Sequence, residues 1–165
     1  MNPRTENCPE LQLSLEFNNL HPRLSYSDLK LRSFFESICS LYSGCPTGVL
    51  SIVFMERERH NRLHGEFLND FRPTDVITFP TDPDEGLAGE ICVSVDQAKE
   101  ESITRKIPFC HELALYLIHG WLHLVGFDDL EKFERQLMRN EEQRCLHLIR
   151  KSNLWPDFNL APSVP

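Results

Sequence analysis

Residues 113–129 read LALYLIHGWLHLVGFDD, and this stretch carries most of the information about the fold and its chemistry. Its first part is apolar nearly all round, which is typical of a helix that is buried on every side. Pro108 can open this helix, and the apolar pattern continues to about Val125. Gly126 comes next, and a glycine there permits the left-handed turn that ends a helix. The sequence therefore predicts a long buried helix that stops at Gly126.

Upstream of this helix, strand and helix patterns alternate. Apolar and polar residues alternate from Leu11 to Phe17, which indicates a half-buried strand. Ser25 or Ser27 can cap a helix with one apolar face, formed by Leu31, Phe34, Phe35, Ile38 and Tyr42 and ended by Ser43-Gly44. Further strands are predicted at Val49–Met55, Thr74–Phe79 and Glu90–Val95, and further helices at Glu56–Asn69 and after a cap at Asp96.

Downstream, Asp128 can open a last helix that runs to about Lys151, and Trp155 to Pro165 contains three prolines. The order of elements predicts an α+β fold, in which one small mixed sheet packs against several helices. We expect a single catalytic domain over residues 1–153 and a loose C-terminal tail over residues 154–165.

Composition limits the classes of function. The chain has 165 residues and a net charge of −8, which argues against broad electrostatic capture of nucleic acid. Two segments could still supply a local basic groove, but acids interleave both, which favours solvated helix faces. The basic residues are Arg57, Arg59, Arg62 and Arg72 in the first segment, and Arg135, Arg139, Arg144, Arg150 and Lys151 in the second.

The compartment follows from what the sequence lacks. No run approaches the roughly 20 apolar residues of a membrane span, and the polar N-terminus does not resemble a signal peptide. The six cysteines are irregularly spaced without a C-x-x-C pair, so we expect free thiols. These features predict a cytoplasmic protein with no membrane contact.

Two histidines on the buried helix predict a metal site. His119 and His123 are four residues apart, so their side chains share one helix face. Two ligands are too few for zinc in a protein. A continuing helix would carry Asp129 about 9 Å further along its axis, but the bend at Gly126 can return it as a third ligand. We therefore expect one zinc ion on His119, His123 and Asp129, with the fourth position open for hydrolysis.

Other interpretations of the same residues remain open. Histidines four apart occur by chance on buried helices, and Asp128 or Asp129 could cap the next helix, with Asp128 and Glu131 at capping-box spacing. The spacing also matches the zinc-protease pattern H-E-x-x-H-x-x-G-x-x-H. Gly120 stands where that pattern has its glutamate base, and Asp129 where it has the third histidine. The missing base disfavours a peptidase.

Three segments together resemble the YbeY family of bacterial metal-dependent endoribonucleases. Residues 119–128 fit the family pattern H-G-x-L-H-L-x-G-[YF]-D-H throughout. Residues 73–80, PTDVITFP, are similar to P-T-D-V-L-[ST]-F, and residues 89–94, GEICVS, are similar to G-D-I-x-I-S. The resemblance implies an α+β fold with three metal ligands, at His119, His123 and Asp129, where a cleft ends. It also implies cleavage of single-stranded RNA in ribosomal RNA maturation and ribosome quality control.

The chain departs from the family pattern at two positions. Aspartate stands where the family usually has its third histidine, and its negative charge weakens the Lewis acidity of a bound metal. Many members also carry an arginine in L-N-x-x-[YF]-R upstream of P-T-D. An ungapped alignment puts Leu68 at the arginine position, whereas an alignment with a deletion gives Arg72. Arg72 is the best candidate for the cation that binds the scissile phosphate.

The resulting interpretation is a cytoplasmic, metal-dependent RNA hydrolase with His119 and Arg72 in catalytic roles. Its expected partners are ribosomal RNA and the small ribosomal subunit, together with ribosomal or assembly-factor proteins. A ribosome-assembly factor with a structural or vestigial metal site is the alternative, and a metalloprotease-like hydrolase comes third.

Overall fold

The computed structural model describes residues 13–80 and 83–163 of the chain. Leu11, at the start of the first predicted strand, Cys8, and the end of the predicted tail from residue 164 lie outside the described residues. Within the described part, none of the helices combines the length and the apolar character that a membrane span requires.

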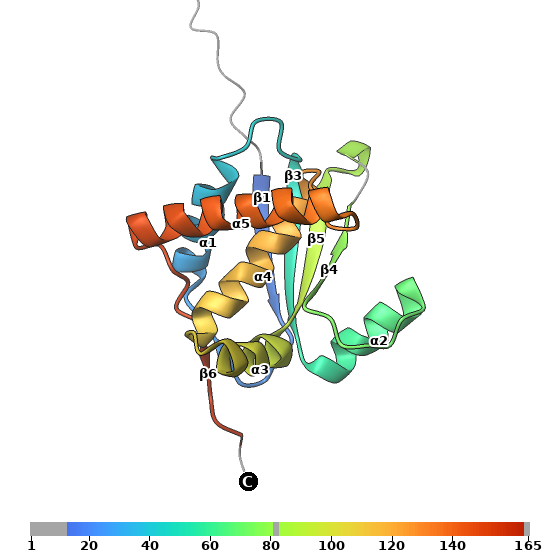
Figure 1. The fold of residues 1–165 in the computed structure, drawn as a ribbon, viewed down its shortest axis with the longest axis vertical. Helices are drawn as coiled ribbons and strands as arrows, with labels where there is room; N and C mark the ends of the chain where they lie inside the picture. The colour runs from blue at the N-terminus through green and yellow to red at the C-terminus, as the bar shows by residue number, and fades with distance from the viewer. Residues whose placement is uncertain (1–12, 81–82, 164–165) are drawn as a thin grey trace, which may run out of the picture.

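A four-stranded mixed sheet forms the centre of the molecule (Figure 1). Three strands are parallel: β1 (Leu13–Asn19), β3 (Gly48–Met55) and β5 (Leu87–Ser94). The fourth, β4 (Val76–Phe79), pairs with β5 in antiparallel orientation and forms one edge in the order β1-β3-β5-β4. The strand order and orientation confirm the predicted small mixed sheet and the α+β class.

Five helices surround this sheet in the described residues. They are α1 (Asp28–Cys39), α2 (Arg57–Leu68), α3 (Val95–Arg105), α4 (Phe109–Leu124) and α5 (Lys132–Ser152). A short 3-10 turn, η1 (Pro83–Glu85), precedes β5. Figure 1 shows α5 crossing the C-terminal part of α4, which is where the predicted metal ligands lie.

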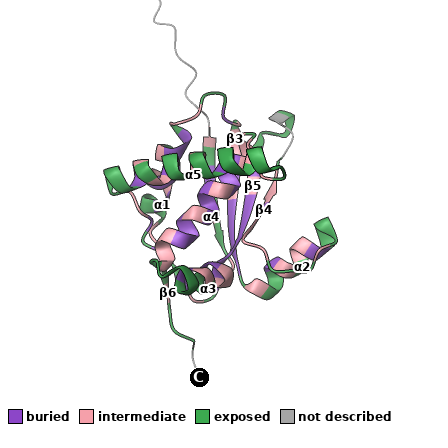
Figure 2. Cartoon of the chain, viewed as in Figure 1, coloured by how far each residue is buried: buried purple, intermediate pink, exposed green. Residues whose placement is uncertain are grey.

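The two faces of the sheet are covered differently. On one face, alternate strand residues such as Ile52 and Ile91 pack with Leu117 and Trp121 of α4 in the main core, to which α1 and α5 also contribute. On the other face, a smaller cluster of Val53, Met55, Ile77 and Cys92 packs against Leu63 of α2. Figure 2 shows the buried strands and α4 at the centre, with the outward side of α5 exposed. Helix α4, which carries His119 and His123, is therefore held between the sheet and α5.

Two predicted helix starts are wrong. Helix α3 is capped by Ser94, whose hydroxyl accepts the amide of Gln97, and the predicted cap Asp96 lies in the first turn. Helix α5 begins at Lys132 behind a cap at Glu131, three residues past the predicted cap Asp128. The Asp128 carboxylate accepts the amide of Asp129 instead (2.8 Å), so it stabilises the loop before the helix.

Most of the described tail is packed, in contrast to the loose segment that its prolines suggested. Strand β6 (Asn159–Leu160) pairs with β2 (Leu24–Ser25), and Trp155 stacks on His111 of α4. Phe158 is buried against Tyr26 and Phe54. Burial of these aromatic side chains outweighs the turn-forming tendency of the prolines.

The described cysteines are all free, as predicted. Burial raises the pKa of the Cys145 thiol and of the other described thiols, so they behave as small apolar core residues.

Candidate metal centre

A tight bend ends α4 and returns the chain towards it. Gly126 has a φ of 103°, in the region that favours glycine. Its amide donates to the carbonyl of His123 (3.1 Å), and the amide of Phe127 donates to the carbonyl of Leu122 (3.0 Å). These are the two hydrogen bonds of a Schellman motif. The predicted bend at Gly126 is confirmed, and it places Asp129 beside the helix instead of beyond it.

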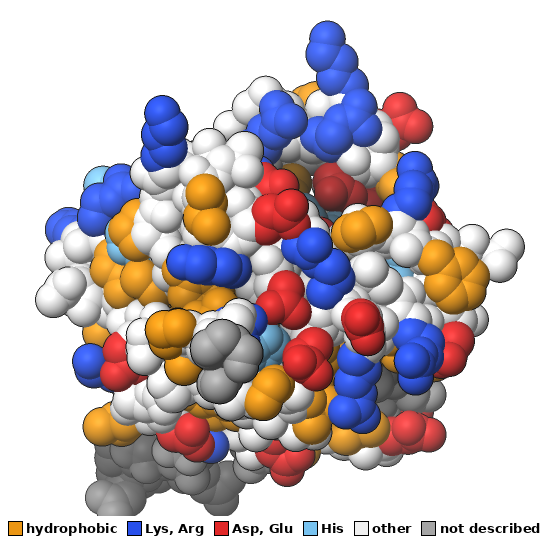
Figure 3. All heavy atoms as spheres, turned by 90° about the horizontal axis from the view of Figure 1, so that it is seen from below, with side chains coloured by type: hydrophobic (Ala, Val, Ile, Leu, Met, Phe, Trp, Pro, Cys, Tyr) orange, Lys and Arg blue, Asp and Glu red, His pale blue; other side chains and the backbone are white. Residues whose placement is uncertain are grey.

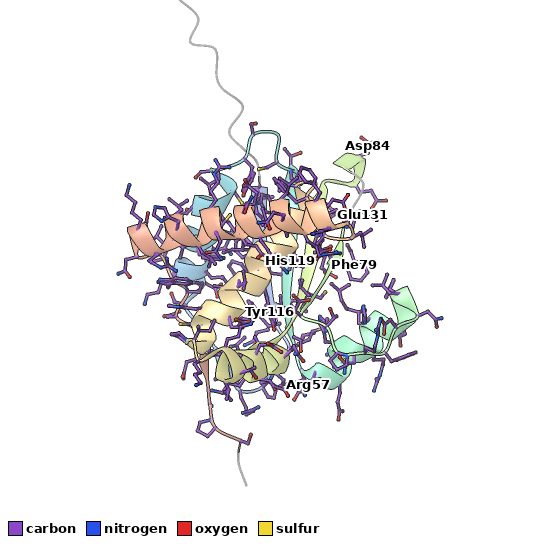
Figure 4. The ribbon with its side chains drawn as sticks, in the orientation of Figure 1. Arg57, Phe79, Asp84, Tyr116, His119 and Glu131 are labelled. Carbon is purple, nitrogen blue, oxygen red and sulfur yellow. The ribbon has the colours of Figure 1, made fainter. Side chains whose placement is uncertain are left out.

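The bend brings the three predicted ligands together. His119 Nε2 lies 3.1 Å from His123 Nε2 and 3.4 Å from the nearer Asp129 carboxylate oxygen. His123 Nε2 lies 3.9 Å from the other oxygen of Asp129. One donor atom from each residue fits within a group 4.8 Å across, so these side chains can hold one metal ion. All three are half-buried, and Figure 4 shows His119 on the part of α4 that lies against α5.

The second ring nitrogen of each histidine has a fixed acceptor. His119 Nδ1 lies 2.7 Å from a carboxylate oxygen of Glu142 on α5, and His123 Nδ1 lies 3.1 Å from the carbonyl oxygen of Phe127. A carboxylate and a carbonyl only accept, so both Nδ1 atoms carry the proton and both Nε2 atoms present lone pairs. Facing lone pairs 3.1 Å apart, beside a carboxylate, repel one another unless a cation lies between them. The donor set therefore fits a divalent metal, with the outer-shell partners that metal-binding histidines usually have.

The charges around His119 also favour a cation at this position. Burial acts to lower the pKa of His119, but the hydrogen bond that His119 donates to Glu142 and the charges of Asp75, Glu142 and Asp129 outweigh it. The net effect raises the pKa of His119 above its ordinary value. The surroundings of this imidazole therefore stabilise positive charge at the centre of the group.

Gly120 packs against the sheet and leaves no room for a protease base. A Cβ atom at this position would lie 2.7 Å from Ile91 Cγ2 and 3.0 Å from Val76 Cγ2. A glutamate there would collide with β4 and β5, on the side of α4 that faces the sheet. The close packing of α4 on the sheet therefore excludes a general base at position 120.

A hollow of about 380 Å³ opens beside His123. It lies between the end of α2 and strand β4, and Phe67 packs edge-on against Phe79 at its border, with ring centres 5.0 Å apart. Phe67 is 62% exposed. The lining consists of Phe67, Leu68, Val76, Ile77, Thr78, Phe79 and His123. One of the three candidate metal ligands, His123, therefore faces an open, largely apolar hollow.

The structure does not bring Arg72 to the three ligands. Arg72 lies between α2 and β4 with an exposed side chain, and its guanidinium donates to both carboxylate oxygens of Asp70. Its carbonyl oxygen lies 3.2 Å from His64 Nδ1. Leu68, the residue at the arginine position of the ungapped alignment, lines the hollow. No other hydrogen bond or ion pair of the Arg72 side chain occurs among the described residues.

Sequence reasoning missed two residues that hold the site in place. Glu142 follows His119 by 23 positions, and no local spacing connects them. Arg135 of α5 donates to the carbonyl oxygens of Asp129 (3.3 Å) and Leu130, which fixes the loop that presents the aspartate. Both contacts depend on how α5 crosses α4, so a motif within residues 113–129 contains no signal for them.

This chain is similar in sequence to proteins of a known family. A family model described as Endoribonuclease YbeY matches residues 17–150. An endoribonuclease YbeY of Protochlamydia amoebophila is 36% identical over 110 residues, which cover 64% of this chain and 73% of that protein. One from Carboxydothermus hydrogenoformans is 29% identical over 137 residues, covering 81% and 96%.

Among solved structures, TM1509 from Thermotoga maritima has the same fold, with a TM-score of 0.59 at 24% identity over 85% of this chain and 93% of that one. Together with the fold and the grouped histidines, the matched family model identifies the chain: it belongs to the endoribonuclease YbeY family.

Proposed function

We propose that this chain is a metal-dependent endoribonuclease that cleaves single-stranded RNA during ribosomal RNA maturation. In this proposal His119, His123 and Asp129 hold one zinc ion. The observation that carries it is the convergence of two Nε2 lone pairs and a carboxylate, with both Nδ1 atoms bound by acceptors. The relatives' names supply the substrate class.

A bound divalent ion would supply Lewis acidity at a phosphoryl oxygen. Glu142 and the Phe127 carbonyl orient the two imidazoles, and the bend at Gly126 holds Asp129 in reach of both. RNA brings its own 2′-hydroxyl nucleophile, so the absence of a protein base at Gly120 is compatible with RNA cleavage and unfavourable for peptide hydrolysis. The half-buried ligands and the hollow beside His123 give a substrate access, which favours an enzyme over a purely structural metal site.

Arg72 is the proposed phosphate-binding cation by family resemblance alone. A phosphate would have to displace the Asp70 carboxylate, because both share the exposed guanidinium. Replacement of Arg72 by alanine therefore tests this role separately from the metal.

The metal is tested through Asp129. We expect purified wild-type protein to bind one zinc ion per chain and Asp129→Ala to lose more than about 100-fold in zinc affinity, beyond the usual effect of removing an outer-shell partner. Asp129→His, which restores the family ligand, should retain the ion. Competition with a chromophoric chelator measures the affinities. Equal affinity in wild type and Asp129→Ala would show that Asp129 is not a ligand.

The reaction is tested with a labelled single-stranded RNA and with casein, using wild type, His123→Ala and Arg72→Ala, each with and without chelator. We expect RNA cleavage by wild type that is abolished by chelator and by His123→Ala, with casein left intact. RNA cleavage that survives both treatments would come from a contaminating nuclease and would contradict the proposal. Chelator-sensitive cleavage of casein would instead support the protease interpretation.

A further inference from the structure

Helix α5 separates its charges by side. All six of its Lys and Arg side chains are exposed, and none of its acidic side chains is. The basic residues are Lys132, Arg135, Arg139, Arg144, Arg150 and Lys151. This is unusual in a chain with a net charge of −8. Acids interleave with these cations along the sequence, but in the folded helix the acids are half-buried and the cations exposed.

The three acidic side chains of α5 are half-buried, and each of them has a hydrogen-bond or ion-pair partner. Glu134 accepts the amide of Glu131 in the capping box, and Glu142 accepts from His119. Glu141 accepts from the hydroxyl of Tyr42 and pairs with Arg144. Among the described residues, Glu141 is the one acid of α5 that pairs with a cation of the same helix, Arg144. The cations are exposed, as expected of a solvated helix face, but the acids between them in the sequence are half-buried.

Three of the cations lie on one line along the helix. At about 100° per residue, Lys132, Arg139 and Arg150 point within about 20° of one another and span about 27 Å. Among the described residues, none of these three side chains makes a hydrogen bond or an ion pair. Fixed positive charges without partners indicate a surface for an extended anion.

The basic face is continuous with the candidate metal centre. Arg135 donates to the carbonyl of Asp129, so the first turn of the face touches the loop that presents a metal ligand. A hollow of about 450 Å³ lies on this part of α5, lined by Lys132, Phe133, Arg135, Gln136 and Arg139, and Phe133 is 73% exposed. An aromatic side chain among cations is the combination that binds single-stranded nucleic acid, by stacking and by phosphate contact.

The face of the molecule seen from below does not share this pattern. Figure 3 shows the molecule from below, where Lys, Arg, Asp and Glu side chains lie interspersed across the centre of the view. That mixture is expected of an ordinary solvated surface. The charge separation on α5 therefore does not extend to this face of the molecule.

We propose that the exposed face of α5 is a phosphate-binding track for single-stranded RNA, which extends from the Asp129 loop along the helix. Lys132, Arg139 and Arg150 contact successive parts of the RNA backbone, and Phe133 stacks on a base next to the metal centre. The proposal rests on the proposed function for the choice of RNA as the anion. It supplies substrate affinity in addition to any phosphate contact of Arg72, whose guanidinium is paired with Asp70.

The test compares two matched triple variants of the full chain. Lys132→Gln/Arg139→Gln/Arg150→Gln removes three cations from α5. The control, Arg59→Gln/Arg62→Gln/Lys99→Gln, removes two arginines from α2 and one lysine from α3. These three side chains are also exposed, and among the described residues they make no hydrogen bond or ion pair. Binding of a labelled single-stranded RNA is measured from 50 to 200 mM salt, with zinc content and circular dichroism as checks on the site and the fold.

We expect the α5 variant to lower the slope of log affinity against log salt by about 2, since each phosphate contact on a single strand contributes about 0.7. The KM for RNA should rise, while kcat and zinc content stay unchanged. The α2/α3 variant should keep the wild-type slope. An unchanged slope in the α5 variant, or an equal decrease in both variants, would overturn the track.

Failure of the proposed function gives a different result. Wild-type protein would then leave RNA intact, while the difference in salt slope between the two variants would persist. RNA cleavage by wild type, with a slope that α5 does not affect, would overturn the track and leave the endoribonuclease proposal standing.

Discussion

Glu142 is the residue that most clearly connects the packing of the protein to its chemistry. Its carboxylate lies 2.7 Å from His119 Nδ1, and both side chains are largely removed from solvent. A proton held at Nδ1 leaves the Nε2 lone pair directed at His123 and Asp129. Carboxylates in this position orient metal-binding imidazoles and increase their basicity.

We predict that Glu142→Ala weakens zinc binding by about 10- to 100-fold, because His119 loses the partner that fixes its tautomer and its ring orientation. Chelator competition at constant pH measures the change. Glu141→Ala is the matched control, since the neighbouring carboxylate binds Tyr42 and Arg144 and makes no contact with a histidine. Equal zinc affinities in the two variants would show that Glu142 is only a packing partner of α4.

Sequence reasoning succeeded at residues whose relationships are local. His119, Gly126 and Asp129 lie within eleven positions, so helix periodicity and the conformational freedom of one glycine were enough to place the ligands together. The same reasoning failed for Glu142, because its contact requires knowledge of where α5 crosses α4. The role of Arg72 as phosphate-binding cation stays a prediction, and the structure pairs its side chain with Asp70, two residues away.

Between elements, the close approach of α4 to the sheet depends on Gly120. Its backbone meets Ile91 and Val76 without a side chain in between, and the histidines one residue before and three residues after it face the other way, towards Asp129 and α5. The Gly120 side of α4 packs closely on β4 and β5. His119 and His123 are therefore presented on another side of the helix.

We predict that Gly120→Ala lowers the free energy of unfolding by about 1–3 kcal/mol, as expected when a methyl group is forced into a packed interface. In an open helix the same change would raise stability by up to about 1 kcal/mol. Gly65→Ala in α2 is the control, because the ring that its Cβ would meet belongs to Phe71, an exposed side chain that can move. Urea denaturation measures both variants. A stability gain in Gly120→Ala would contradict the close packing of α4.

Helix boundaries show which local signals are ambiguous. Asp128 is a favourable cap residue and has Glu131 at capping-box spacing, yet the box that forms is Glu131 with Glu134. Glutamate is not a preferred cap, so the sequence favoured the wrong acid. The error has a structural reason, because the Schellman bend needs the residues after Gly126 for the loop that carries Asp129.

Across the whole molecule, the segment around Phe158 is joined to residues far upstream by contacts that no local pattern contains. Phe158 packs on Tyr26 and Phe54, more than 100 positions upstream, and β6 pairs with β2. The prolines of this segment predicted a loose tail because proline frequency is a local statistic, whereas burial depends on residues far away in the sequence. The fold class and the strand positions were predictable because hydrophobic periodicity is local.

A buried acid lies in the same core. Glu112 on α4 is fully buried, and neither of its carboxylate oxygens has a hydrogen-bond partner among the described residues. The guanidinium of Arg105 lies 3.6 Å from one of these oxygens and forms an ion pair with it. Burial raises the pKa of Glu112 above its ordinary value and the charges of Glu101, Asp75 and Glu142 add to the effect, while Arg105 opposes it.

This raised pKa makes the stability of the whole molecule depend on pH, with a definite sign. The folded state holds the proton on Glu112 more tightly than the unfolded state, so the contribution of this group to stability is fully present below its ordinary pKa of 4.5 and is lost as pH rises through the folded pKa. Each pKa unit corresponds to about 1.4 kcal/mol. Glu112→Gln keeps the shape without the charge. We therefore predict that its free energy of unfolding, relative to wild type, increases as pH rises from 5 to 8.

Urea denaturation at pH 5, 6, 7 and 8 measures this difference, with Glu58→Gln on the exposed side of α2 as the baseline for removal of one carboxylate. A difference that stays constant from pH 5 to 8 would mean that Arg105 fully compensates an ionised Glu112. A difference that grows with pH places an uncompensated carboxyl group within α4, the helix that carries His119 and His123.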